Sequence, residues 1–124
     1  MRRAYGRRWK TVYSASHSHQ LRPGRTAGDV FAAHARAFDA HGLARHRLNA
    51  CGYALGAKFT PSWMDMPMFY EANPFEIAAD QVYFLHMILM DSDSQTALCL
   101  GRTYLVGESQ AEPINAPRLD LVCK

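Results

Sequence analysis

The sequence has few cysteines and lacks the short motifs that identify several common classes of enzyme. Its three cysteines, Cys51, Cys99 and Cys123, are odd in number and far apart. They predict reduced thiols in a cytoplasmic protein rather than a disulfide framework. The chain contains no Gly-x-Ser-x-Gly elbow, no phosphate-binding glycine loop and no Cys-x-x-Cys pair. These absences exclude the routes to function that such motifs provide.

Long hydrophobic runs are absent as well. The longest near-apolar stretch, Val82–Met90, is too short to span a bilayer and contains His86. The basic start of the chain is not followed by the apolar segment of a secretory signal. We therefore expect no membrane partner.

Acidic residues are missing from positions 1–25, which hold seven of the 14 Lys and Arg residues. A basic arm for nucleic acid or a mitochondrial presequence is one interpretation of this stretch. Tyr5 and Trp9 are thin support for either, so a solvated segment is favoured and nucleic acid is not expected as a partner. With 124 residues, 48% of them hydrophobic, the chain is long enough for one domain with a modest core.

A helix is predicted after the turn at Pro23 and Gly24. Thr26 is a suitable N-cap with Asp29 as its capping-box partner, and Gly42 supplies the stop. Six side chains fall at helical spacing and predict one face: Val30, Phe31, His34, Ala37, Phe38 and His41.

The remainder of the chain predicts strands and one long loop. Gly52–Gly56 indicates a short strand or bend where backbones approach closely, and residues 60–76, with three prolines, indicate a long structured loop. Residues 81–90 predict a strand buried on both faces, and residues 97–106 predict its antiparallel partner after a turn. Pairing Met90 with Ala97 places His86 opposite Gly101, on the same face as Phe84, Ile88 and Cys99.

Two side chains stand out as candidates for chemistry. His86 lies inside an apolar strand, where an imidazole needs compensating partners, although a satisfied core histidine is the more common case. Asp65 lies among aromatic residues, where desolvation would raise its pKa, although a loop-capping aspartate explains it equally well. The spacings of the other histidines form no complete metal site, and Asp91–Gln95 indicates a plain hairpin turn rather than a calcium loop.

The order of segments from Arg22 onward resembles the second half of the creatinase/aminopeptidase family, which includes methionine aminopeptidases, Xaa-Pro dipeptidases and an ectoine-hydrolase-like branch. Residues 22–30, RPGRTAGDV, are similar to the family's R-P-G-x-T-x-x-D-V. Residues 41–43, HGL, with 52–56, GYALG, are similar to H-G-L … G-H-x-I-G. Residues 79–86, ADQVYFLH, and 101–108, GRTYLVGE, are similar to x-P-G-M-V-F-x-x-E-P and E-x-T-x-L-V-T-E. The resemblance covers residues 22–124 and leaves residues 1–21 as an unmatched basic segment.

This resemblance implies an α+β fold, the C-terminal half of a pita-bread domain, in which a helix packs on a curved antiparallel sheet. The family holds two divalent metal ions with two aspartates from the first half and a histidine and two glutamates from the second. The histidine place here is Tyr53, and the glutamate places are His86 and Gly101. None keeps the usual ligand, so the expectation is no metal and no other cofactor.

The function that the resemblance implies is hydrolysis of a C–N bond in a small amide or dipeptide, without metal. His86 would be the general base, Tyr53 would donate a hydrogen bond and Asp65 would orient or pair. Arg102 would hold a substrate carboxylate, and Trp63 belongs to an aromatic loop that could enclose a small substrate. The missing half would come from a second copy of the chain or from another protein.

Two alternatives stay open. The chain could be a truncated, non-catalytic remnant of such a domain. It could also be a relative of dimethylsulfoniopropionate lyases, with the aromatic loop enclosing a small zwitterion by cation–π contact.

Overall fold

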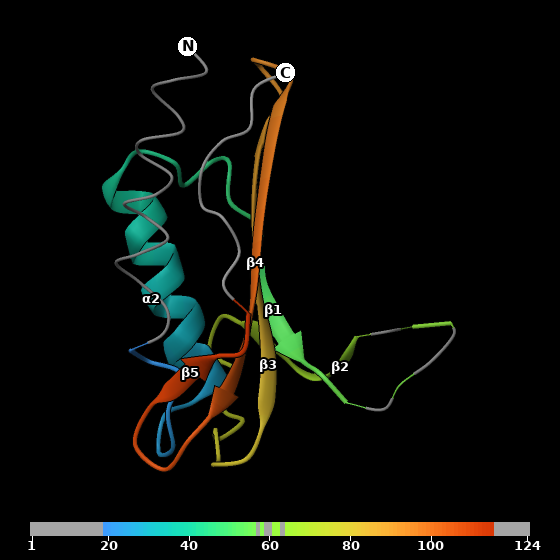
Figure 1. Cartoon of the computed structure of the whole chain (residues 1–124). Coiled ribbons are helices and arrows are strands. Elements are labelled where there is room, and N and C mark those ends of the chain that lie inside the picture. The colour runs from blue at the N-terminus through green and yellow to red at the C-terminus, as the bar shows by residue number, and fades with distance from the viewer. Residues whose placement is uncertain (1–18, 57, 59–60, 63, 116–124) are drawn as a thin grey trace.

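A computed structural model describes residues 19–56, 58, 61–62 and 64–115. The described chain forms one helix, α2 (Ala27–Ala40), and a five-stranded antiparallel sheet in the order β2-β1-β3-β4-β5. Figure 1 shows α2 lying along one side of the sheet, and the connection between β1 and β2 projects from the other side. The predicted α+β class with a helix packed on an antiparallel sheet is confirmed.

Helix α2 begins where the sequence predicted. Thr26 Oγ1 accepts a hydrogen bond from the Asp29 backbone N–H (3.1 Å), and Asp29 Oδ2 accepts one from the Thr26 N–H (3.0 Å). This reciprocal capping box satisfies two of the four N–H groups that a helix start leaves unpaired. The helix ends at the C-cap His41, followed by Gly42 with φ 72°, a conformation that glycine adopts without strain.

Strands β3 (Val82–Asp91) and β4 (Thr96–Val106) form a long hairpin at the centre of the sheet. Their register pairs Met90 with Ala97 and His86 with Gly101, as the sequence predicted. The turn is a plain hairpin: Asp91 Oδ1 accepts from the backbone N–H groups of Asp93 and Ser94 at 3.1 and 3.3 Å. The Asp91 carboxylate therefore organises the turn itself.

The prediction that β3 is buried on both faces was wrong. Burial alternates along it: Tyr83, Leu85, Met87 and Leu89 are buried, and the residues between them are partly exposed. A continuous apolar run suggested two covered faces, yet α2 packs on one face only (Figure 1). The partly exposed residues on the other face belong to the candidate site described below.

The predicted long loop over residues 60–76 was also partly wrong, because β2 (Asp65–Tyr70) lies within it. β2 is an edge strand, paired antiparallel with β1 (Ala50–Ala54). Pro67 lacks a backbone N–H, which an edge strand tolerates because one side of it needs no ladder partner. A proline is therefore weaker evidence against an edge strand than against a central one, and the other two prolines of residues 60–76 lie outside β2.

The short strand predicted around Gly52 is β1, which pairs with β2 on one side and with β3 on the other. A Cβ atom at Gly52 would collide with the backbone carbonyl oxygen of Phe84. The close backbone approach expected for this glycine is confirmed. β5 (Ala111–Pro113) completes the opposite edge of the sheet beside β4.

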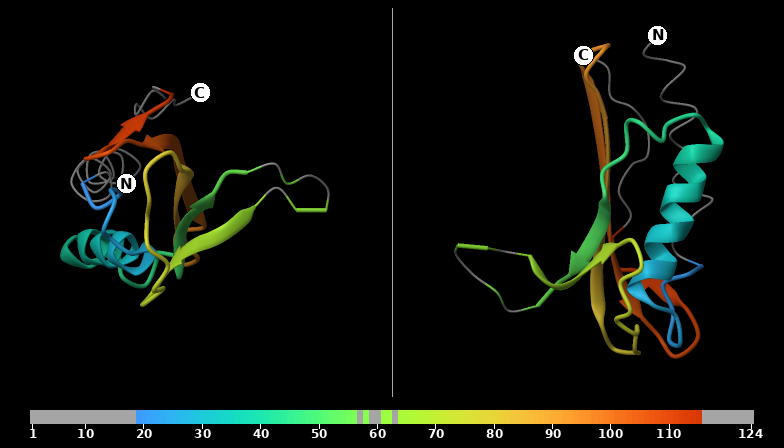
Figure 2. Two further views of the ribbon diagram at one scale, coloured as in Figure 1. Left: turned by 90° about the horizontal axis from the view of Figure 1, so that it is seen from below. Right: turned by 180° about the vertical axis from the view of Figure 1, so that it is seen from behind.

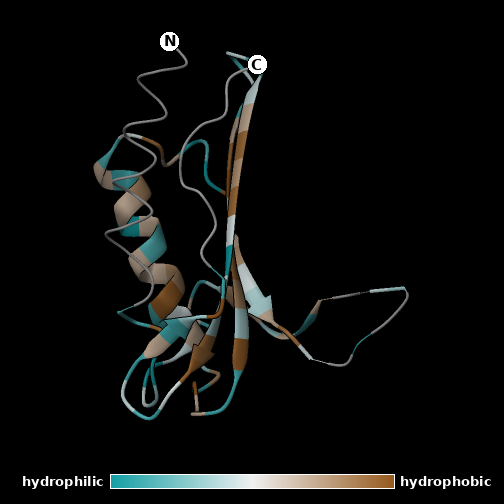
Figure 3. Ribbon diagram, viewed as in Figure 1, coloured by the Kyte–Doolittle hydropathy of each residue, from teal (hydrophilic) through white to brown (hydrophobic). Residues whose placement is uncertain are grey.

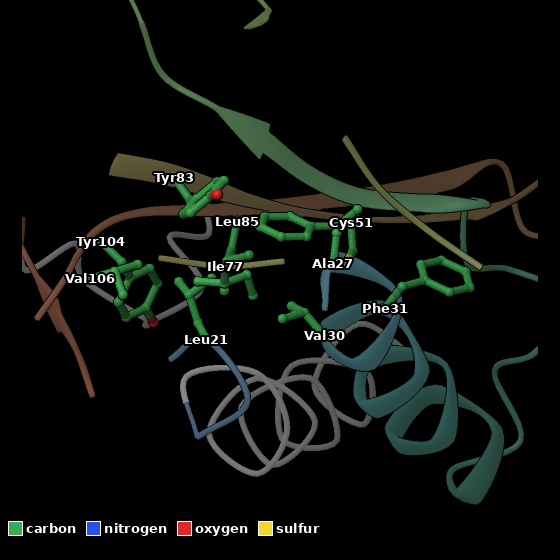
Figure 4. Close-up of a cluster of buried hydrophobic side chains, with 11 residues drawn as sticks. Leu21, Ala27, Val30, Phe31, Cys51, Ile77, Tyr83, Leu85, Tyr104 and Val106 are labelled. Atoms are coloured by element: carbon green, nitrogen blue, oxygen red, sulfur yellow. The ribbon is translucent and has the colours of Figure 1, made fainter. Parts of the chain in front are cut away.

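The core lies between α2 and the sheet (Figure 4). Its main cluster joins Val30 and Phe31 of the helix to Leu85 of β3 and Val106 of β4. Leu21, the last residue of the segment that we assigned outside the domain, is fully buried in it. The helix alternates hydrophilic and hydrophobic residues, and the strands mix hydrophobic stretches with neutral and hydrophilic ones (Figure 3). Nothing helical in the described ranges combines the length and apolarity needed to cross a membrane.

Candidate functional site

The face of the sheet turned away from α2 carries the residues singled out by the sequence. We call it the open face and define it by Tyr53 of β1, Phe84, His86 and Ile88 of β3, and Cys99 and Gly101 of β4. These residues alternate with the buried ones on the helix side, so their side chains leave the sheet in the opposite direction. Figure 2 shows the sheet from two further sides, with α2 on the far side of it from the β1–β2 connection.

His86 is the centre of this face. Its Nε2 lies 2.7 Å from Cys99 Sγ. Its ring lies 5.1 Å from that of Phe84, tilted by 35°, and 6.5 Å from that of Tyr53, edge-on at 87°. Burial lowers the pKa of His86 below its ordinary 6.5. The imidazole is therefore kept in the neutral form that accepts a proton at pH 7.

The rings of Tyr53 and Phe84 lie together beside the imidazole. Their own rings meet edge to face at 5.5 Å, a favourable aromatic arrangement, and Tyr53 is buried although it lies on the open face. The ring of Phe84 also lies over Gly101, where an added Cβ would collide with it. Glycine at this position therefore makes room for the phenyl ring.

Asp65 is not brought to His86. It begins β2, opposite Ala54, and β1 separates its strand from β3, a backbone distance of roughly 10 Å. Its Oδ1 accepts from the Met66 N–H at 2.8 Å and lies 3.6 Å from Lys58 Nζ. The carboxylate thus contacts residues at the end of the β1–β2 connection and not the imidazole. Trp63, predicted to contact substrate, lies outside the described residues.

Arg102 lies on the other side of the sheet. It pairs with Leu85 of the core cluster, and paired residues in an antiparallel ladder point to the same side. Because it neighbours Gly101 on β4, its side chain leaves the strand toward α2 and away from His86. This placement does not support the substrate-binding role predicted for Arg102.

Cys99 contacts His86, and the sequence did not single it out as a candidate for chemistry. It pairs with Ile88, two positions from the His86–Gly101 pair, so it is a diagonal neighbour of His86. The predicted register already placed Cys99 on the same face as His86, and this placement was the signal in the sequence that could have identified it. Its contact with Nε2 depends on the side-chain rotamers, which the register does not specify.

The residues of this face do not fit the pair of divalent metal ions that the fold family implies. Of the three second-half ligand places, Tyr53 and Gly101 offer no carboxylate or imidazole, and the Phe84 ring fills the space above Gly101. Within the described part of the chain, no three His, Cys, Asp or Glu residues gather closely enough to hold an ion. Two hard cations need more oxygen ligands than this set provides.

No family model and no curated protein matches the sequence. The structure is similar to dipeptidase PepE from Mycobacterium ulcerans, with a TM-score of 0.82 and 19% identity over 95% of this chain. It is also similar to a dipeptidase from Pyrococcus horikoshii (TM-score 0.82, 13% identity, 96% of this chain). An X-Pro aminopeptidase from Thermotoga maritima gives a TM-score of 0.81 with 8% identity over 95% of this chain.

This chain spans only about a third of those structures: 30%, 33% and 32% of their lengths, respectively. At these identities the likeness shows the fold. The predicted fold, one half of a pita-bread domain, is confirmed, and the share covered agrees with a C-terminal half.

Proposed function

We propose that the chain is part of a hydrolase that cleaves the C–N bond of a small amide or dipeptide without metal, with His86 as general base. The observation that carries this proposal is the placement of His86. It faces Gly101 on the open face, at the paired positions that hold glutamates in the family that the sequence resembles. The fold shared with dipeptidases and an X-Pro aminopeptidase supports the class of substrate.

The chemistry of this face follows from its neutral imidazole. Nε2 of His86 would take the proton of the attacking nucleophile and return it to the leaving nitrogen. Tyr53, whose ring meets His86 edge-on, would donate a hydrogen bond to the developing oxyanion. No role in this scheme falls to Arg102 or Asp65, which lie elsewhere in the structure.

A complete site requires a covering partner for the open face. The same side of the sheet exposes Met90 (52%), which pairs with Ala97, and Leu105 (43%), which pairs with Val82. We propose that a second copy of the chain or a separate half-domain covers them, and we place the assembly in the cytoplasm. The exposed surface equally suits a non-catalytic remnant, which is the second candidate function.

The test is hydrolysis of a panel of dipeptides and small amides by the full chain, with and without a strong chelator. We expect turnover that the chelator leaves unchanged and that His86→Gln lowers by about 100-fold or more. In a plot of the hydrolysis rate against pH, the fall on the acidic side should lie below pH 6.5, because burial lowers the pKa of His86. His19→Gln, at an exposed position, is the control. Chelator-sensitive turnover, or full activity in His86→Gln, would contradict the proposal.

A further inference from the structure

The open face carries a nucleophile beside its base. Cys99 is exposed, and its Sγ lies 2.7 Å from Nε2 of His86. A thiol within hydrogen-bonding distance of an imidazole, with that imidazole oriented by other groups, is the arrangement that covalent catalysis needs. Here the rings of Phe84 and Tyr53 lie beside the imidazole, at 5.1 and 6.5 Å, and limit its orientation.

We infer that Cys99 is the nucleophile of this site and that it accepts the acyl group of the small amide or dipeptide as a thioester. The inference rests on the proposed function, since it names the attacking group of the same reaction. It is distinct from the alternative in which His86 activates a water molecule directly.

The reaction balances with these two side chains and one water molecule. Cys99 Sγ attacks the carbonyl carbon while its proton passes to His86 Nε2. The C–N bond then breaks, and the nitrogen leaves with the proton from Nε2. Water, losing a proton to Nε2, attacks the thioester; the C–S bond breaks, the acid departs and the proton returns to Sγ.

The local electrostatics favour a neutral pair at rest. Burial raises the pKa of Cys99 and lowers the pKa of His86, so the thiol and the imidazole both stay uncharged. The thiol proton therefore moves as the electrophile is attacked, which is the way a serine–histidine pair works. No resting thiolate is required.

Cys51 provides an internal comparison within the same chain. It is fully buried in the core cluster, and burial raises the pKa of its thiol. Such a thiol is inert toward reagents in water. A reagent that modifies Cys99 and spares Cys51 therefore reports the environment of the open face.

The experiment acylates the full chain with para-nitrophenyl acetate and locates the acetyl group by peptide mass spectrometry. All variants carry Cys123→Ser, because Cys123 lies outside the described residues. We expect acetyl thioester on Cys99 and none on Cys51. His86→Gln should slow the acetylation of Cys99 by about 100-fold or more, because the variant lacks the general base that accepts the thiol proton. His19→Gln should leave the rate unchanged.

Two results would overturn the inference. The first is acetylation of Cys99 at the same rate in the parent and in His86→Gln, provided that thermal melting shows both folded. The second is amide hydrolysis that survives in Cys99→Ala and Cys99→Ser but is lost in His86→Gln. That second result would leave the proposed hydrolase in place, with water as its nucleophile. Acetylation of Cys99 that depends on His86, in a chain that cleaves no amide, would support the nucleophile and reject the hydrolase.

Discussion

His34 is the histidine of α2 and is buried, with 1% of its surface exposed. It lies between Phe31 and Phe38, at ring distances of 5.9 and 4.5 Å. Burial, and to a lesser extent the charge of Arg47, lowers its pKa to about 4, against an opposing effect of Asp39. The folded protein therefore keeps this imidazole neutral where an unfolded chain would protonate it.

This histidine predicts an acid-sensitive fold. Because its pKa is lower in the folded state than its ordinary 6.5, the unfolded state binds the extra proton as the pH falls. The free energy of unfolding should decrease between pH 6.5 and about 4, by up to about 3 kcal/mol from this group. Urea unfolding of His34→Leu should show a shallower pH dependence over that range. An unchanged slope would contradict the assignment, and His19→Gln is the exposed control.

At the scale of elements, the contact of Phe84 with Gly101 couples the two central strands on the open face. The ring of Phe84 leans diagonally across the ladder and covers the glycine of β4. An aromatic side chain that covers a glycine on a neighbouring strand protects backbone that would otherwise be exposed. The same ring packs on His86, so the strand contact and the site geometry depend on one side chain.

Gly101→Ala should therefore destabilise the protein by about 1–3 kcal/mol, since the new methyl group meets the Phe84 ring. Phe84→Leu should relieve part of that cost, because a smaller side chain leaves room. A double-mutant cycle by urea unfolding measures this coupling. Strictly additive effects of the two substitutions would show that the ring moves aside freely.

The elements themselves differ in how well the sequence predicted them. The α2 start depends on residues three positions apart, Thr26 and Asp29, so local chemistry suffices. The β3–β4 register follows from a short turn that leaves one pairing for the rest of the hairpin. β2 was missed because it contains Pro67 and lies between two further prolines, and it forms a strand by pairing with β1 at the edge of the sheet.

At the scale of the whole molecule, α2 covers one face of the five-stranded sheet that the described residues form, and the opposite side of the sheet carries exposed Met90 and Leu105. Apolar surface of this kind on a sheet favours association with another chain. The solved peptidases contain about three times the length of this chain. Those peptidases therefore contain additional chain that is available to cover the surface corresponding to the open face.

We expect the full chain to self-associate through the open face. Light scattering should show a species larger than a monomer, and Ile88→Lys should shift it toward monomer by placing a charge on that face. Phe75→Lys is the matched control, since Phe75 is exposed (41%) next to the start of α2. A discrete dimer would support an enzyme whose site is completed by a second copy of the chain. Broad aggregates would support the non-catalytic remnant. A monodisperse wild-type monomer would contradict the expectation.

The sequence by itself determined the helix start and the central hairpin with its register, because caps, turns and residue periodicity act over short distances. The fold class followed from the resemblance of its segments to a known family. The sequence also placed His86 opposite Gly101, since one register decides every pair of a hairpin. The tertiary structure decided which face α2 covers, and hence that Arg102 turns away from His86. It also separated Asp65 from the site and brought Cys99 Sγ to Nε2. Such outcomes depend on packing between distant segments and on rotamers, which no local pattern in a single sequence specifies.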